Sequence, residues 1–209
     1  MFPLYADGAL VVLEKPAGLL SVPGRGADKQ DCLSTRVQGV LPDALIVHRL
    51  DMATSGLMLM ARNNSAQLQL NRMFAERSIH KRYVALVHGL PGEVGGGWTE
   101  IDLPIALDWE HRPRRTVNLE SGKASLTRWR VLARHGAGQF TRLELEPVTG
   151  RSHQLRVHLQ AIGHPILGDA LYGQAPPPGC TRMMLHASQL DLLHPVTGAA
   201  LHFSSAADF

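Results

Sequence analysis

Short apolar runs separated by turn residues divide the chain into many strands and few helices. Leu10–Leu13 is apolar and ends before Pro16 and Gly18, which interrupt regular structure. Leu57–Ala61 is continuously apolar, which is typical of a strand buried on both faces. The same reasoning predicts further strands at 44–47, 82–88, 99–103, 124–132, 141–146, 183–193 and 200–203.

Helical spacing of apolar residues occurs in three segments. The first helix is predicted over about 28–38, and the second follows Asn63 or Asn64, either of which can cap its first turn. The third is predicted from His153 to about Ile162, with Ser152 as its cap. Strands outnumber helices and short turns join them, which favours an α+β fold with a mixed, mainly antiparallel central sheet flanked by helices.

Composition is that of an ordinary globular protein with a mild basic excess. The 209 residues are 44% hydrophobic and 19% charged, which suits one large domain or two closely packed halves. The formal net charge is +3 and the sequence pI is about 9.1. This excess is compatible with a nucleic-acid partner, but many proteins without one share it.

The two cysteines and the lengths of the apolar runs indicate in which cellular compartment the protein is expected. Cys32 and Cys180 cannot form a disulfide framework or a four-cysteine zinc site, and they fit a reducing cytoplasm. The first residues lack the features of a signal peptide, and no apolar run approaches the roughly 18 residues that span a membrane. A cytoplasmic protein without a membrane partner is expected, and no obligatory protein partner is evident.

One candidate site lies between two apolar strands, in the segment His48–Gly56. Its acid, Asp51, is expected close to the interior, where a carboxylate is costly unless it is paired or hydrogen-bonded. The alternative is a structural turn in which Asp51 bonds to the backbone of Thr54 or Ser55. Residue types alone favour the structural turn.

A second candidate site is the helix start at Gly150–His158. Free amides at a helix N-terminus attract anions, and Arg151 and Arg156 would strengthen a seat for phosphate or for a carboxylate. The alternative is a solvated basic helix face. His153 and His158 are five residues apart, which is not the spacing of a helical metal pair, so no metal site is predicted.

These segments resemble motifs of the RluA family of pseudouridine synthases. His48–Gly56 is similar to the family signature HRLDxxTSG, and Lys15–Gly18 to its KPxG element. Lys81–Tyr83 resembles KxY, and Gly150–Arg156 resembles GRxHQxR. Residues 163–169 and 185–187 also look like family segments. The motifs occur in the family's order and together cover nearly the whole chain.

The resemblance implies an enzyme without a cofactor that isomerises uridine in RNA. Residues 1–209 would form a single catalytic domain, with no separate N-terminal RNA-binding domain and with an active-site cleft across the sheet. Asp51 would be the catalytic carboxylate, Arg151 its charge-assisted partner, and Tyr83 would lie against the uracil. The resemblance does not choose between attack at C1′, attack at C6 and elimination. On a strand, a lone Tyr is otherwise a core or rim residue.

The resemblance also implies how RNA is held. Arg49 would fill the place that an extruded uridine leaves, since a guanidinium plane can stack and donate hydrogen bonds. The expected RNA contacts are His48, Thr54, His153, Gln154 and Arg156. The implied substrates are a uridine in 23S ribosomal RNA and one in the anticodon stem-loop of certain tRNAs.

Two rival interpretations come from other functional classes. An inactive RNA-binding module on the same fold would be expected to lack the acid, its arginine or the tyrosine, and all three are present. A nucleoside or glycoside hydrolase would need a second carboxylate beside Asp51. Glu14 and Asp169 are the conceivable candidates for that second acid.

Overall fold

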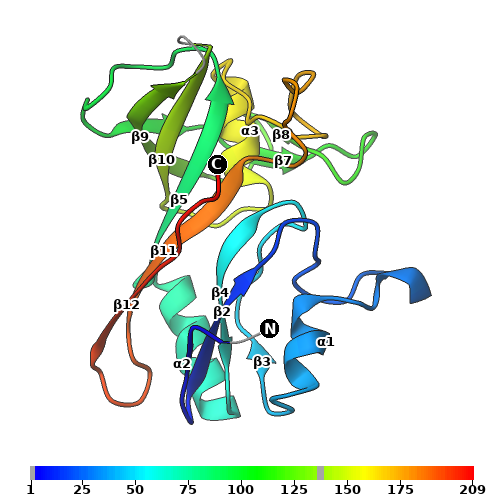
Figure 1. Ribbon diagram of the computed structural model, residues 1–209, viewed down its shortest axis with the longest axis vertical. Coiled ribbons are helices and arrows are strands. Elements are labelled where there is room, and N and C mark those ends of the chain that lie inside the picture. The colour runs from blue at the N-terminus through cyan, green and yellow to red at the C-terminus, as the bar shows by residue number, and fades with distance from the viewer. Residues whose placement is uncertain (1–2, 136–138) are drawn as a thin grey trace. The chain divides into compact units, whose positions relative to one another are not determined.

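The chain forms two compact units. The computed structural model describes residues 3–135 and 139–209. Unit 1 combines the chain up to Lys81 with His186–Asp208, whereas unit 2 comprises Arg82–Leu185 and Phe209 (Figure 1). Among the described residues, no helix is long and apolar enough to cross a membrane.

Unit 1 is a mixed sheet with two helices. Its strands follow the order β1-β2-β4-β11, with β12 beside β11 and β3 beside β4. Strands β4 and β11 pair in parallel, and the other strand pairs described in this unit are antiparallel. The elements are β1 (Tyr5–Ala6), β2 (Leu10–Lys15), η1 (Ala27–Lys29), α1 (Leu33–Gln38), β3 (Leu45–Ile46), β4 (Ser55–Ala61), α2 (Asn64–Ala75), β11 (Leu185–Leu193, apart from its first residue) and β12 (Ala200–Ser204).

Strand β4 is buried along all seven residues, as its apolar run predicts. Leu57 and Leu59 face the core cluster that includes Ala66 and Leu70 of α2. Met58 and Met60 face the opposite cluster, which includes Leu33 and Val37 of α1. Because successive strand residues point to opposite faces, one strand supplies both cores of unit 1.

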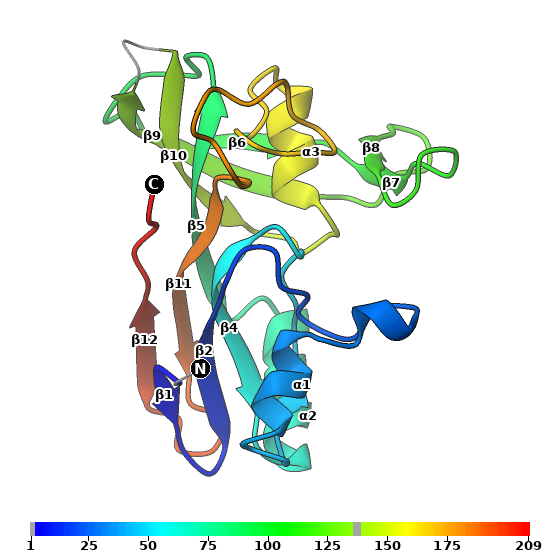
Figure 2. The same ribbon diagram turned by 45° about the vertical axis from the view of Figure 1, so that its right-hand side comes forward.

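Unit 2 is an antiparallel sheet with one helix and a hairpin. Its strands follow the order β5-β10-β9-β6, and β7 and β8 form a separate two-stranded sheet. The hairpin extends away from this sheet, and α3 lies beside the sheet (Figure 2). The elements are β5 (His80–His88, apart from its first two residues), β6 (Thr99–Asp102), β7 (Ile105–Leu107), β8 (Arg115–Val117), β9 (Leu126–His135), β10 (Phe140–Pro147) and α3 (Gln154–Ala161).

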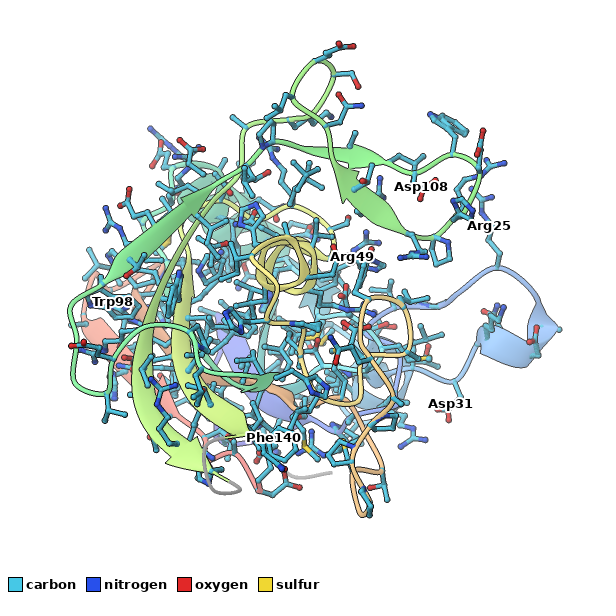
Figure 3. All side chains as sticks on the ribbon, turned by 90° about the horizontal axis from the view of Figure 1, so that it is seen from above. Arg25, Asp31, Arg49, Trp98, Asp108 and Phe140 are labelled. Carbon is cyan, nitrogen blue, oxygen red and sulfur yellow. The ribbon has the colours of Figure 1, made fainter. Side chains whose placement is uncertain are left out.

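The two faces of the unit 2 sheet differ in polarity. Alternate residues of β10 are buried, beginning with Thr141. The other face carries ion pairs across neighbouring strands, such as Arg82 with Glu146 at 3.1 Å. Trp98, labelled in Figure 3, has the Arg82 guanidinium 4.4 Å and the Arg130 guanidinium 4.8 Å from its ring centroid. One face of this sheet therefore forms the core, and charges cover the other.

The fold class is confirmed, with local corrections. The helix predicted over 28–38 is interrupted, because Cys32 is extended (φ −153°) and caps a shorter α1 by accepting a hydrogen bond from the Thr35 amide. Of the two possible caps before α2, Asn63 is used. Ser152 does not cap α3. The residue before the helix is His153, which adopts the left-handed conformation at φ +58°. The short strands β1, β7 and β8 were not predicted.

Candidate active site

The turn between β3 and β4 brings together four predicted site residues of unit 1. Asp51 is partly buried and Thr54 is buried, whereas Arg49, labelled in Figure 3, is exposed. The Thr54 amide donates a hydrogen bond to the main-chain carbonyl of Asp51 at 3.1 Å. A turn is therefore present, as the structural alternative predicted, and it is closed through the main-chain carbonyl of Asp51.

His48 is the last of these four predicted site residues, and its side chain contacts other residues of unit 1. Its Nε2 accepts a hydrogen bond from the Leu59 amide at 2.8 Å, and its ring lies 4.8 Å from that of Phe74. Burial, and secondarily the charge of Lys81, lower the pKa of His48 to about 3. Neutral His48 therefore supports β4, and the nitrogen that meets Leu59 is not available to RNA.

Two buried side chains, Lys15 at the end of β2 and Ser21 in the loop after it, hold the main chain on either side of Asp51. Lys15 is fully buried, and its Nζ donates to the carbonyls of Pro16 (2.9 Å), Leu19 (2.7 Å) and Met52 (3.0 Å). Burial lowers the pKa of Lys15 to about 8, although the charge of Asp51 acts in the opposite direction. The Ser21 hydroxyl forms hydrogen bonds with the carbonyl and the amide of Leu50. Sequence reasoning treated Lys15 only as part of a motif and missed Ser21.

Gly56 closes the segment at the start of β4. It pairs with Ala187 of β11 and adopts φ +108°, a region that other residues rarely enter. A Cβ atom placed there would lie 2.3 Å from the Ala187 carbonyl oxygen. Only glycine therefore fits at this position of the HRLDxxTSG-like segment.

In unit 2, Arg151 lies in the loop before α3 and its side chain is exposed. Its amide donates to Oε1 of Gln154 at 3.0 Å, and its Nε donates to the Ala124 carbonyl at 3.2 Å. Gln154 is buried, and its Nε2 donates to the Leu126 carbonyl and to Thr127. Gln154, for which contact with RNA stays a prediction, fastens the loop that carries Arg151.

His153 is held by a residue that sequence reasoning missed. The Tyr172 hydroxyl accepts a hydrogen bond from the Arg115 amide at 2.7 Å and lies 2.7 Å from Nδ1 of His153. With the amide as donor, the hydroxyl proton is free to point to Nδ1. Tyr172 thereby links strand β8 to the residue that adopts the left-handed conformation before α3.

Arg156 is buried in an ion pair, which excludes the solvated helix face considered for it. Its Nε and Nη2 donate to the two carboxylate oxygens of Asp169 at 2.7 and 2.8 Å. Burial acts to raise the pKa of Asp169, but hydrogen bonds and charge from Arg156 outweigh it and the pKa is lowered. Asp169 is therefore committed to a structural pair. The other conceivable second acid, Glu14, is exposed and accepts a hydrogen bond from Ser205.

Tyr83 lies in β5 of unit 2, opposite Leu145 of β10, and is partly buried. Asp51 belongs to unit 1, whereas Tyr83 and Arg151 belong to unit 2, and the pairing of Asp51 with Arg151 stays a prediction. Within the part of the chain that the structure describes, no group of three or more His, Cys, Asp or Glu residues is arranged to hold a metal ion.

Comparisons with known proteins agree with the motifs. Residues 9–161 match a family model described as RNA pseudouridylate synthase. A Yersinia pestis protein named dual-specificity RNA pseudouridine synthase RluA is 46% identical over 210 residues, covering 100% of both chains. The Escherichia coli K12 protein of that name is 45% identical, covering 99% of this chain and 93% of that one. Human RNA pseudouridylate synthase domain containing 1 matches with a TM-score of 0.77 and 31% identity, over 98% of this chain and 82% of that structure.

Proposed function

The chain belongs to the RNA pseudouridylate synthase family, and from this premise we propose that Asp51 is the carboxylate with which it isomerises uridine. The reaction breaks the bond between C1′ and N1, turns the uracil and joins C1′ to C5. The C5 proton is lost and N1 gains one, so neither redox chemistry nor hydrolysis is involved. An ionised carboxylate beside the sugar and base is the group that this chemistry needs.

The observation that carries this proposal is the anchoring of the turn 50–54. Lys15 fixes the Met52 carbonyl, Ser21 fixes Leu50, and the Thr54 amide closes the turn on Asp51. A carboxylate on a rigid turn keeps its orientation while a substrate is brought to it, and fixed geometry is a large part of catalytic power. A merely structural turn on the surface would not need three buried anchors.

The remaining roles are proposed for residues of unit 2 and for Arg49. Arg151 would pair with Asp51 and keep it ionised, and Tyr83 would stack on the uracil. A tyrosine with an ordinary pKa near 10 is a poor base at neutral pH, so stacking is the role that its chemistry favours. The exposed Arg49 would occupy the place of the extruded uridine. Residues 1–209 would act as one catalytic domain in the cytoplasm.

The proposed substrates are stem-loops of 23S ribosomal RNA and of tRNA. Relatives that match along the whole chain are named dual-specificity enzymes, and loops expose base edges that a protein can read. Unstacking a base costs a few kcal/mol and is least costly in a loop. Both considerations favour loop uridines over uridines within a duplex.

The test is to incubate purified protein with unmodified 23S ribosomal RNA and with total tRNA, and to map pseudouridine by carbodiimide treatment and primer extension. Wild-type protein should form pseudouridine in both pools, whereas Asp51→Asn should form none. Asp43→Asn is the matched control, because Asp43 is an exposed acid of the same unit whose contact is an ion pair with Arg62. An Asp51→Asn variant as fast as wild type would refute the site, and release of free uracil would indicate a hydrolase instead.

A second experiment separates catalysis by Arg151 from RNA binding. Arg151→Met should fold normally, because the partly buried contact with Gln154 is made by the Arg151 amide, and the contact of its Nε with the Ala124 carbonyl is exposed. Its single-turnover rate should fall far more than its RNA affinity. Equal losses in rate and affinity would mean that Arg151 is only a phosphate contact.

A further inference from the structure

Ser21 makes an unusual pair of hydrogen bonds with the residue that precedes Asp51. Its hydroxyl donates to the Leu50 carbonyl at 2.6 Å and accepts from the Leu50 amide at 3.0 Å. Ser21 is 3% exposed and Leu50 is 6% exposed, so water cannot replace these bonds. One side chain thus satisfies both main-chain polar groups of Leu50.

Ser21 is itself fixed from the other side. The Ser34 amide in the first turn of α1 donates to the Ser21 carbonyl at 3.2 Å, and the Leu33 amide donates to the Leu20 carbonyl at 2.8 Å. The Gly18 amide donates to the Met52 carbonyl at 2.8 Å. The loop 18–21 is therefore hydrogen-bonded to α1, which packs in the core, and also to both neighbours of Asp51, Leu50 and Met52.

From this geometry we propose that Ser21 is a positioning residue for catalysis, holding the Asp51 carboxylate in register through Leu50. The inference rests on the proposed role of Asp51. Lys15 holds Met52 after the acid, and Ser21 holds Leu50 before it. With only one of these anchors, the peptide between Leu50 and Asp51 can rotate, which turns the carboxylate while the fold persists.

The effect on the reaction follows from the tolerance of catalytic geometry. A misplacement of 1 Å can lower a rate by about 100-fold, so Ser21→Ala should lower the single-turnover rate by at least about 10-fold. RNA affinity should stay within about twofold of wild type, since Ser21 is buried and cannot touch RNA. Ser21→Thr, which keeps the hydroxyl, should recover most of the rate, and Ser21→Cys serves where the added methyl group does not fit.

Ser34→Ala is the matched control. Ser34 is also a serine of unit 1 that is 3% exposed, and its hydroxyl contacts the Cys32 sulfur rather than the turn 48–56. A merely structural role for Ser21 predicts that both alanine variants lose stability and keep their rate when assayed well below their melting temperatures. The positioning role predicts that only Ser21→Ala loses rate.

The experiment combines single-turnover pseudouridine formation and RNA binding with amide hydrogen exchange of the free protein. Ser21→Ala should speed exchange at the Leu50 amide, and Ser34→Ala should not. Unchanged exchange at Leu50, or a wild-type rate in Ser21→Ala, overturns the inference. Failure of the proposed function is a separate result: there, Asp51→Asn matches wild type, or wild type forms no pseudouridine.

Discussion

The turn that carries Asp51 and the loop that carries Arg151 are fixed by opposite kinds of chemistry. In unit 1, the buried Lys15 and the partly buried His48 support the turn, and burial lowers the pKa of each. In unit 2, the helix that follows the loop is held by a full ion pair between Arg156 and Asp169, and the pKa of Asp169 is lowered. The surroundings of the Asp51 turn therefore disfavour positive charge on Lys15 and His48, whereas Arg156 and Asp169 of unit 2 depend on keeping their charges.

The largest expected effect tests the tight contact in unit 1. Gly56→Ala would place a Cβ atom 2.3 Å from the Ala187 carbonyl, in a conformation at φ +108°. We expect a loss of about 4 kcal/mol or more in the free energy of unfolding, the range reached when strain and overpacking combine. Urea denaturation measures it. Gly8→Ala is the control, because a Cβ atom there meets nothing within 4 Å, and similar losses in both variants would contradict the prediction.

The next effect concerns the ion pair in unit 2. Arg156→Met leaves the Asp169 carboxylate buried without its cation, and breaking a buried pair in this way costs about 3–5 kcal/mol. Arg36→Met removes one partner of an exposed pair with Asp31, whose side chains are 50% and 63% exposed, and should cost far less because solvent screens that pair. Denaturation of both variants compares them. A small loss in Arg156→Met would show that unit 2 does not depend on this pair.

The third prediction concerns the pH dependence of stability that His48 of unit 1 causes. Unfolded His48 gains a proton as pH falls through about 6.5, but folded His48 resists it until about 3, so stability is lost as pH falls within that window. The loss between pH 6.5 and 5 should be about 1 kcal/mol after allowance for partial exposure. His48→Gln can still accept the Leu59 amide without titrating, so its unfolding free energy should fall less steeply.

His88 and His158 of unit 2 also have pKa values lowered by burial, and both variants of this experiment retain them. The difference between wild type and His48→Gln therefore isolates His48. Parallel pH profiles for the two proteins would mean that His48 carries no such penalty.

The smallest effect concerns the link between β8 and the start of α3. Tyr172→Phe removes only the hydroxyl that joins the Arg115 amide to His153. Leaving this partly buried amide without its acceptor should cost about 1 kcal/mol. Nitrogen NMR of the His153 ring should report a changed tautomer balance, because Nδ1 loses its donor. An unchanged ring spectrum would show that the hydroxyl does not set the tautomer.

Periodicity in the sequence predicted the elements whose signals are local. The apolar run of β4 and the asparagine before α2 gave the correct element types, because each reflects burial or capping within a few residues. The helix predicted over 28–38 was wrong in its first part. There Leu20 forms a bridge with Cys32 and draws the chain into an extended conformation, and a contact across twelve residues leaves no periodic trace.

Candidate site residues were predicted by motif, but their roles depend on distant partners. From the sequence, Arg156 and Gln154 are polar residues at a helix start. In the structure, Arg156 has a buried partner in Asp169 and Gln154 has one in Thr127. Ser21 carries no signal in the sequence, since its importance lies in reaching Leu50, 29 residues away. Sequence motifs therefore mark where chemistry occurs, and they do not separate the residues that react from those that hold them.

The division of unit 1 into two chain segments has a consequence for synthesis on the ribosome. Strand β4 needs β11 as its parallel partner, and β11 is translated only after nearly all of unit 2. A nascent chain therefore exposes one edge of its most apolar strand for more than half of its elongation. Chaperones that shield such edges would have their longest opportunity here, and messages truncated before codon 186 would yield chains in which the contact of Gly56 with Ala187 never forms.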